Sequence, residues 1–573
     1  MAPPSIDRWR RRLPALLVGA VAVLPFLNSL HGDFVFDDIS LIREHPMVNG
    51  SESPLHLLTW VNQPGAYRPL TMLTYAANAR VSLAPFAFHV VNLGLHLLVT
   101  LSALALAKLL LRSTPGATVT ALLFAVHPIH TEAVSNIVGR AELLAALFVL
   151  ASLLTFARVH QTTGRRRAVW LGLAAMAFAA ALLSKESAMA TIPLLAVLHL
   201  RIAPQRRGGQ LVALMLPFVV VAAGYLALRV LVVGSLTMAD PPSFLDNPLA
   251  HVSTASRLET ATVILWDYLA LLAVPAQLSA DYSFNQIPVV TSALDPSFVA
   301  AAAIFSLLGL GLLLTARRAP MLSVAVVFFA APLLLTANLL FPIGTIKAER
   351  LLYLPSFGWC LAFGWLALQA PRSAQPRWLG LAAIVVIACA GRTWIRNNDW
   401  KDSLSLFTAT VATAPGSAKA HHNLAIAYNL LGRRDEAMLH FRSALAIDPT
   451  YAAAAFGIGH VYDRKGLDAG ALHWYAKAVS MNWGFSKAHL NSGLIRFRYG
   501  EFVAAETAFR AGLESAPRDP LLLINLSAAR LAQGDSWGAR AILDQVAGLG
   551  PRDPEVVELL AMARHSVEEA SHL

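Results

Sequence analysis

Long apolar runs fill this chain up to about residue 395 and then stop. A helix needs roughly 20 mostly apolar residues to cross the hydrocarbon core of a bilayer. Of all 573 residues, 56% are apolar and only 14% are charged, whereas a soluble domain carries about a quarter charged residues. The sequence therefore predicts an all-α chain, with a polytopic membrane domain over residues 1–395 and a soluble, charge-bearing tail.

Eleven segments are expected to span the membrane. They cover residues 13–30, 89–111, 117–127, 143–158, 168–183, 187–200, 210–233, 297–315, 321–341, 351–370 and 378–394. No small-residue cleavage site follows the first segment, so we expect it to remain as an anchor rather than to be removed as a signal peptide. Segment 259–275 is ambiguous: it either crosses the membrane or lies at its interface.

The basic residues indicate how these segments are oriented. The formal net charge is +11, but the charges lie in short clusters between apolar runs, which is typical of topology signals and not of a nucleic-acid surface. The clusters are Arg8–Arg12, Lys108/Arg112, Arg158/Arg165–Arg167, Arg201/Arg206/Arg207, Arg317/Arg318 and Arg372/Arg377. All fall on one side if segment 259–275 stays at the interface. The positive-inside rule then predicts about eleven spans, a cytoplasmic N-terminus and a tail on the outer side.

The polar-rich connections then converge on the outer face. They are residues 31–88, 128–142, 184–187, 234–296 and 342–350. Polar groups at a membrane boundary are costly unless they are solvated or paired, so their convergence indicates a functional site on this face.

A 34-residue repeat runs through the tail. It is marked by Gly432, Gly466, Gly500 and Gly534, by Ala437, Ala471, Ala505 and Ala539, by Phe441, Tyr475, Phe509 and Leu543, and by Pro449, Pro517 and Pro551. This is the tetratricopeptide pattern, and it predicts four repeats over residues 418–553. Residues 396–417 are expected to form a linker and half repeat, and 554–573 a C-terminal capping helix. Such arrays bind extended peptides, although a spacer or an oligomerisation element is the alternative.

The first outer connection carries two adjacent carboxylates between aromatic residues, Asp37 and Asp38. A carboxylate with a raised pKa can act as a general base, so both are catalytic candidates. Two other interpretations remain open. The pair binds a divalent cation, for which it supplies too few ligands alone, or Asp38 caps a short helix at Ile39–Arg43.

The first two outer connections hold further candidates for substrate binding. His127, His130 and Glu132 are metal-ligand residue types, but Pro128 spoils the i, i+4 spacing of known zinc motifs. We therefore predict no metal site, and count His130 and Glu132 among the substrate-binding candidates. Arg68 in the first connection either seats a sugar or phosphate or packs its loop, and it is included as well.

Four cations lie in the outer connections, at Arg140, Lys185, Lys347 and Arg350. Guanidinium and ammonium groups at the membrane edge can bind phosphate oxygens, so together they predict a site for a lipid phosphate or pyrophosphate. Structural alternatives exist, because Arg140 can snorkel at a helix end and Lys185 can form an ion pair with Glu186. Glu186 is kept as a further substrate-binding candidate.

These motifs occur along the chain in one particular order. The order is Asp37-Asp38, His127–Val134, Gly139–Glu142, Lys185-Glu186, then Phe244, Asp246-Asn247-Pro248, Arg257 and Asp281-Tyr282-Ser283, then Ala348–Pro355, and finally Arg392-Thr393, Arg396-Asn397, Trp400 and Pro415. In this respect the chain closely resembles the transmembrane and tetratricopeptide-repeat-containing family of O-mannosyltransferases, over nearly its whole length. Animal members of that family usually carry longer repeat arrays, so acceptor choice need not transfer.

The resemblance implies a C-type glycosyltransferase architecture and places the catalytic base at Asp37 and Asp38. It also implies a mannosyl polyprenyl or dolichyl phosphate donor, a Ser or Thr hydroxyl of a protein acceptor, and catalysis on the lumenal or periplasmic side. The Ala-, Leu- and Arg-rich composition favours a bacterial inner membrane with periplasmic repeats over an endoplasmic reticulum membrane with lumenal repeats.

The residues by themselves are compatible with that chemistry. A lipid-phosphate sugar needs no nucleotide, and the sequence has no Gly-rich nucleotide loop. Transfer needs a base for the acceptor hydroxyl and cations for the leaving phosphate, so we expect a hexosyl transferase without cofactor or divalent metal. The alternatives are a non-catalytic membrane scaffold and a transporter. The lack of a repeat within the membrane half disfavours the transporter.

Overall fold

The computed structural model describes residues 4–50, 52–61, 65–203, 209–237, 240–371, 373–551 and 553–571. Arg206, Arg207 and Arg372 of the predicted basic clusters lie outside these residues. Every element in the described ranges is a helix, and the chain forms two compact units, Met1–Ala414 and Pro415–Leu573. The prediction of an all-α chain with a helical membrane domain and a tetratricopeptide solenoid is confirmed.

The first unit, which we call the membrane unit, holds sixteen of the described α-helices. They are α1 Pro4–Val23, α2 Pro46–Asn49, α3 Pro69–Val81, α4 Pro85–Leu111, α5 Thr114–Val126, α6 Thr131–Val134, α7 Arg140–Val159, α8 Gly164–Ser184, α9 Thr191–Ile202, α10 Gly209–Val233, α11 Thr254–Ala273, α12 Pro296–Thr315, α13 Pro320–Leu334, α14 Pro355–Gln369, α15 Gln375–Asn397 and α16 Ser403–Thr413. Short 3-10 or π turns join them: η1 Leu24–His31, η2 Ile39–Arg43, η3 Pro54–Leu58, η4 Pro128–His130, η5 Ile137–Gly139, η6 Glu186–Ala190, η7 Pro248–Ala250, η8 Glu349–Leu352 and η9 Asn398–Trp400.

Seven of the eleven predicted spans coincide with helices that are long and apolar enough to cross a membrane. These are Arg12–His31, Pro85–Leu111, Ile137–Val159, Gly164–Ser184, Gly209–Val233, Pro296–Thr315 and Gln375–Trp400. The other four form the shorter helices α5, α9, α13 and α14, of 12 to 15 residues. They are short because each begins or ends at one of the polar motifs of the outer connections.

The ambiguous segment 259–275 lies mostly in α11, a helix of 20 residues. It carries Arg257, Glu259 and Asp267 and is not among the seven apolar spans. This charge content agrees with the interfacial interpretation, because charged side chains are expensive in the hydrocarbon layer.

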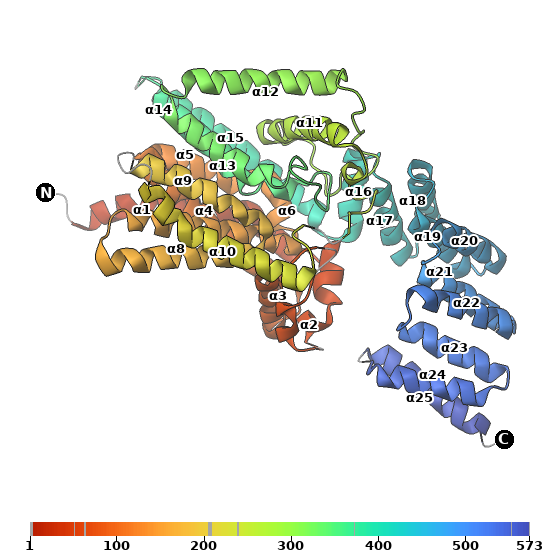
Figure 1. The fold of residues 1–573 in the computed structure, drawn as a ribbon. Helices are drawn as coiled ribbons and strands as arrows, with labels where there is room; N and C mark the ends of the chain where they lie inside the picture. Colours follow the sequence, from red (N-terminus) through yellow and green to blue (C-terminus); the bar gives the residue numbers. More distant parts are fainter. Residues whose placement is uncertain are drawn as a thin grey trace. The chain divides into compact units, whose positions relative to one another are not determined.

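The core of the membrane unit is built around α4, α5, α7 and α14, which pack against one another. In the span that contains α7, 72% of the residues are buried, whereas in α12 only 6% are buried. Figure 1 shows α12 along one edge of the membrane unit and α8 and α10 on the opposite side. The side chains of α7 are thus fixed by packing from several directions, which suits it to position a site at its outer end.

The second unit, the repeat unit, is a row of helical hairpins. Its helices are α17 Ala418–Leu430, α18 Arg434–Ile447, α19 Ala452–Arg464, α20 Asp468–Met481, α21 Ser486–Arg498, α22 Phe502–Ser515, α23 Pro520–Ala532, α24 Ser536–Gly548 and α25 Pro554–Ser571. The turn glycines Gly432, Gly466, Gly500 and Gly534 all have φ between 70° and 86°. Only glycine adopts this left-handed conformation readily, which explains its 34-residue recurrence.

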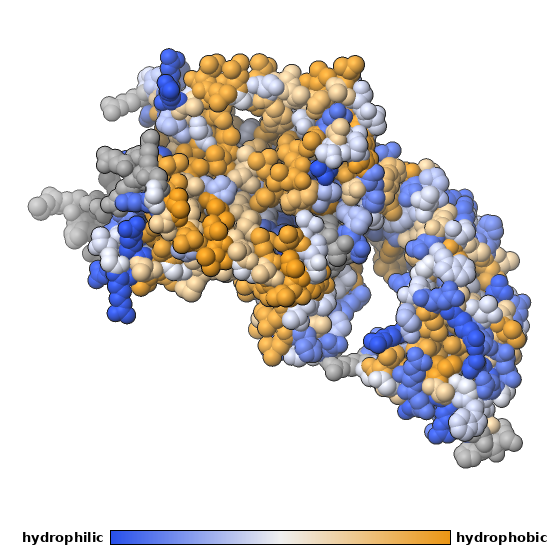
Figure 2. Space-filling view, viewed as in Figure 1, coloured by the Kyte–Doolittle hydropathy of each residue, from blue (hydrophilic) through white to orange (hydrophobic). Residues whose placement is uncertain are grey.

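The two units differ in surface character as the sequence predicts. In Figure 2, hydrophobic residues cover much of the visible face of the membrane unit, whereas hydrophilic residues are frequent on the repeat helices. The predicted half repeat forms α16, which belongs to the membrane unit.

Candidate active site

The first outer connection is held against the end of the last span. Asn397 of α15 donates from Nδ2 to Oδ1 of Asn28 at 2.8 Å, and the N–H of Asp33 donates to the carbonyl of Lys401 at 2.9 Å. The loop that carries the acidic pair and the chain that leaves α15 therefore lie on one face of the membrane unit. This is the arrangement on which the predicted reaction centre depends.

The two aspartates have different environments. The side chain of Asp38 is fully buried; its Oδ1 accepts from the N–H of Val138 at 2.8 Å and its Oδ2 from the N–H of Val35 at 3.2 Å. Burial raises the pKa of Asp38 to about 7. Asp37 is only partly buried. Asp38 therefore ties the loop to the turn before α7, and Asp37 is the carboxylate of the pair that a substrate can reach.

Arg350 in turn η8 is held by the buried carboxylate of Glu132. Glu132 accepts from the backbone N–H of Arg350 at 2.8 Å and from its guanidinium. Burial lowers the pKa of Arg350, but Glu132, Asp37 and Glu142 outweigh that effect and raise it. The Arg350 side chain remains 28% exposed while that of Glu132 is 1% exposed. Glu132 thus fixes the direction of the Arg350 side chain, part of which remains exposed to solvent.

Two more ion pairs continue this cluster. Arg68 donates from Nε and one terminal nitrogen to the carboxylate of Glu186, at 3.0 and 2.6 Å. Burial raises the pKa of Glu186, but Arg68 more than offsets it and lowers the pKa to about 2. The ammonium of Lys185 pairs with Glu142 of α7. The predicted pairing of Lys185 with Glu186 is replaced by pairing across elements, since the extended backbone of Lys185 turns the two side chains to different partners.

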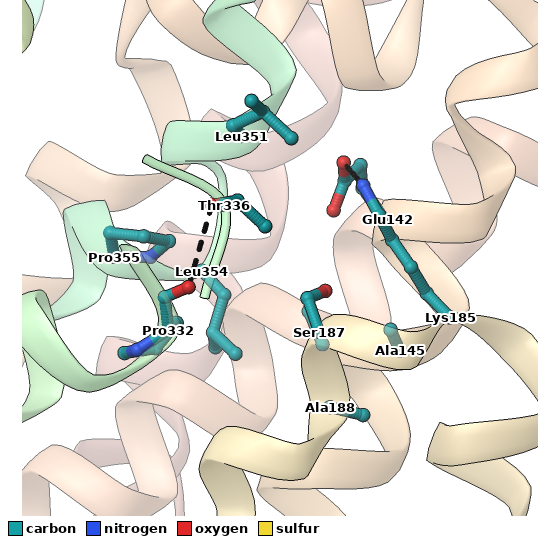
Figure 3. Close-up of a pocket in the computed structure, with 11 residues that line it drawn as sticks. Glu142, Ala145, Lys185, Ser187, Ala188, Pro332, Thr336, Leu351, Leu354 and Pro355 are labelled. Carbon is teal, nitrogen blue, oxygen red and sulfur yellow. Dashed lines mark hydrogen bonds and ion pairs between the residues drawn. The ribbon is translucent and has the colours of Figure 1, made fainter. Parts of the chain in front are cut away.

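A small pocket lies beside the Lys185–Glu142 pair, as Figure 3 shows. Its lining combines the Lys185–Glu142 pair with the hydroxyls of Ser187 and Thr336 and the apolar side chains of Leu351 and others. The lining residues come from α7, η6, the end of α13 and the segment around η8.

Arg140, a predicted phosphate ligand, is enclosed instead. It is fully buried, and its guanidinium donates to Asn92 Oδ1 at 2.8 Å, to Asn78 Oδ1 at 2.9 Å and to two backbone carbonyls at 3.2 Å. It also lies over the rings of Tyr75 and Phe88. With its donors used in this way, Arg140 fixes the outer end of α7 against α3 and α4.

Lys347 and His130 also interact with other side chains of the protein. Lys347 pairs with Asp267 of α11 at 3.2 Å and its ammonium lies 4.5 Å from the ring centre of Tyr282. His130 is fully buried, and its Nε2 shares a hydrogen bond of 2.8 Å with the hydroxyl of Ser356. Both side chains are therefore engaged with other groups of the protein.

For some residues that build the site, the sequence does not show what they bind. Glu142 was part of a quoted motif, but nothing in the sequence shows that it would pair with Lys185, 43 residues away. Asn78 and Asn92 sit in helical segments where an asparagine resembles a surface or capping residue. A buried arginine such as Arg140 needs hydrogen-bond acceptors, but the sequence does not show which residues supply them.

The predicted absence of a metal stays a prediction. Within the described ranges, no group of three or more His, Cys, Asp or Glu side chains is arranged to hold a metal ion. The candidate ligands of the second outer connection face different partners, because His127 meets the carbonyl of Leu272 at 3.0 Å whereas Glu132 binds Arg350.

Comparison with known proteins finds family models and relatives that agree with one another. A family model described as "Protein O-mannosyl-transferase TMTC, DUF1736" matches residues 239–309, and the tetratricopeptide model matches residues 418–451. The human protein O-mannosyl-transferase TMTC3 is 30% identical over 506 residues, with 81% of this chain and 54% of that protein covered. Human TMTC4 is 31% identical over 474 residues, covering 71% of this chain and 63% of that protein.

A structural comparison finds tetratricopeptide proteins. One is a thermophilic tetratricopeptide protein of Thermus thermophilus, at 22% identity and a TM-score of 0.25, covering 32% of this chain and 94% of that one. The chain spans between about half and two thirds of the length of the TMTC relatives described above. The resemblance inferred from the order of the sequence motifs is confirmed by the family matches.

Proposed function

Because the chain is a relative of the TMTC protein O-mannosyl-transferases, we propose that it transfers mannose from a polyprenyl or dolichyl phosphate to Ser or Thr hydroxyls of protein acceptors. The reaction takes place on the non-cytoplasmic face of a multi-pass membrane protein, in a bacterial inner membrane with the repeats in the periplasm. The names of the relatives support the mannosyl transfer, and the charges of the outer face support a lipid-phosphate donor.

In this proposal the acceptor hydroxyl oxygen bonds to C1 of the sugar while the bond from C1 to the phosphate oxygen breaks. Asp37 takes the hydroxyl proton, and the bonding electrons leave with the polyprenyl phosphate. Arg350 stabilises the negative charge that develops on that phosphate. The products are a mannosylated protein and a free lipid phosphate.

The observation that carries the proposal is that the acidic pair and Arg350 are both tied to the same short segment of the chain. Val138 donates to Asp38, and Glu132 binds Arg350, whose side chain stays partly exposed. A base and a phosphate-binding cation must meet at one boundary for this reaction. Arg68 and Lys185, each paired with a carboxylate at the same face, are the further cations that we assign to donor binding.

The direct test uses the whole chain, purified and reconstituted in nanodiscs. It is incubated with radiolabelled mannosyl polyprenyl phosphate and a short Ser/Thr peptide, and the labelled peptide is counted. Transfer of label to the peptide is the expected result. A folded preparation that transfers neither mannose nor glucose from such donors would reject the proposal.

Activity is expected to survive removal of divalent metal. Fixed cations such as Arg350 can take the place of a metal at the leaving phosphate, so the rate of transfer should be unchanged in excess EDTA. The measurement is the initial rate with EDTA and then with added Mn²⁺. Loss of activity in EDTA followed by recovery in Mn²⁺ would contradict this expectation.

The repeats are proposed to recruit the acceptor protein. Deleting residues 418–553 should then spare transfer to a free short peptide, whereas transfer to an intact acceptor protein should fall strongly because local enrichment of the acceptor is lost. The measurement compares the two acceptors at equal hydroxyl concentration. An equal loss for both acceptors would assign the repeats to folding of the enzyme rather than to recruitment.

A non-catalytic membrane scaffold is the second candidate function. It is favoured by one observation, that Arg68, Lys185 and Arg350 each already have a carboxylate partner, as in a purely structural network. A scaffold would give no labelled peptide in the assay above while still binding its partner protein.

A further inference from the structure

The backbone just before Asp37 adopts a conformation that is rare for a large side chain. Phe36 has a φ of 53°, in the left-handed region that an aromatic residue seldom occupies. Such backbone strain persists only where the surrounding structure holds it, and it is frequent at functional sites. The question is therefore which contacts hold Phe36 in this conformation.

The C-terminal end of the turn that contains Phe36 is fixed by hydrogen bonds of Asp38. The N–H of Asp38 donates to the carbonyl of Val35 at 3.0 Å, and the carboxylate of Asp38 accepts from Val35 and Val138. These bonds close the turn from Val35 to Asp38, which contains Phe36 and Asp37. They leave Asp37 as the residue whose direction depends on the backbone at Phe36.

The other end is held by the segment that follows the last span. The N–H of Asp33 donates to the carbonyl of Lys401 at 2.9 Å. The ring of Phe36 meets that of Phe407 in α16 edge to face, with centres 5.7 Å apart and planes at 80°. Edge-to-face contact is a favoured geometry for two aromatic rings. Phe407 is itself 4% exposed, so its ring has little freedom to move away.

Phe407 occupies a position of the tetratricopeptide pattern. It precedes Phe441 by 34 residues and has the same register as Phe441, Tyr475 and Phe509. In the repeat unit this position packs helices together, and Phe441 lies so close to Gly457 of α19 that no Cβ would fit there. At position 407 the same type of side chain contacts the loop of the acidic pair instead.

We propose that Phe407 is a positioning residue for Asp37, acting through the strained backbone of Phe36. The half repeat α16 is then part of the support of the reaction centre rather than a linker. This inference rests on the proposed function, because it assigns Asp37 as the group being positioned.

The test compares Phe407→Ala with Phe441→Ala, a matched control that removes the same buried ring at the same register. On a short free peptide, Phe407→Ala is expected to lower kcat by about 10- to 100-fold with KM unchanged, because a base displaced by an ångström is poorly aligned. Phe441→Ala should leave kcat within about twofold of the parent, because it does not alter the transition state. Phe407→Tyr, which keeps the ring, should restore kcat.

A second readout does not require activity. Amide hydrogen exchange of residues 33–38 should be faster in Phe407→Ala than in Phe441→Ala, because the loop loses the contact that holds it. Equal exchange in the two variants, equal kcat, or a loss confined to KM would each overturn the inference. If Phe407→Ala cannot be purified in folded form, Phe36→Ala removes the other ring and is expected to give the same kcat loss. An inactive parent chain would reject the proposed function, and the exchange result would still decide the role of Phe407.

Discussion

Replacing Asp37 by Asn is expected to lower kcat for mannosyl transfer by about 10²- to 10⁴-fold, the usual contribution of a general base. Asn has nearly the same shape but accepts no proton at neutral pH. Asp37 is only partly buried whereas Asp38 is fully buried, so Asp37 is the accessible carboxylate of the pair. The measurement is kcat with the short peptide, at saturating donor, in the reconstituted chain.

Asp38→Asn is the matched control for this prediction. The amide oxygen can still accept from Val138, but the second acceptor for Val35 is lost. The effect on kcat is therefore expected to be smaller than that of Asp37→Asn and to come with faster exchange of the loop amides. If Asp38→Asn abolishes transfer while Asp37→Asn is tolerated, the assignment of the base is reversed.

Replacing Arg350 by Ala is expected to lower kcat by about 10²- to 10³-fold, as is found when one preorganised charge partner of a transition state is removed. The positive charge opposite the leaving phosphate is lost, and Glu132 is left buried without its partner. Arg350→Lys retains the charge but not the forked guanidinium, so an intermediate loss is expected. The measurement is kcat and KM for the lipid donor.

Arg80→Ala is the control for Arg350→Ala. Arg80 lies in the last turn of α3, in the first outer connection. Its removal changes the charge of the outer face equally but is expected to leave kcat unchanged. Equal losses in the two variants would indicate a general effect of surface charge on donor capture, and the role of Arg350 at the leaving group would then be rejected.

For the acidic pair, the sequence predicts the location of the carboxylates but not the role of each one. The sequence identifies Asp37 and Asp38 as adjacent carboxylates at a membrane boundary. Because both have the same neighbours in the chain, the local sequence cannot distinguish their roles. Their difference arises from the turn before α7, because Val138, 100 residues away, donates to Asp38. The partner of a carboxylate determines whether it is structural or accessible, and the sequence does not give that partner.

For the cations, too, the sequence predicts their location but not whether each is available to a ligand. Four of them were expected to converge on one phosphate, and all four lie in the outer connections of the membrane unit. However, Arg140 is enclosed by asparagines of α3 and α4, and Lys347 pairs with Asp267 in α11. Only a structure distinguishes a guanidinium that binds its own protein from one that remains open to a ligand.

The sequence by itself determined the membrane helices and the repeat array, because apolar length and a 34-residue period are local properties that can be read from a short stretch of the chain. Tertiary structure alone decided which charged side chains are available for chemistry. Arg350 and its partner Glu132 are 218 residues apart, and a contact of that kind depends on how α6 and η8 are packed. The availability of each polar group follows from that packing, because a buried charge must find a partner wherever the fold places one.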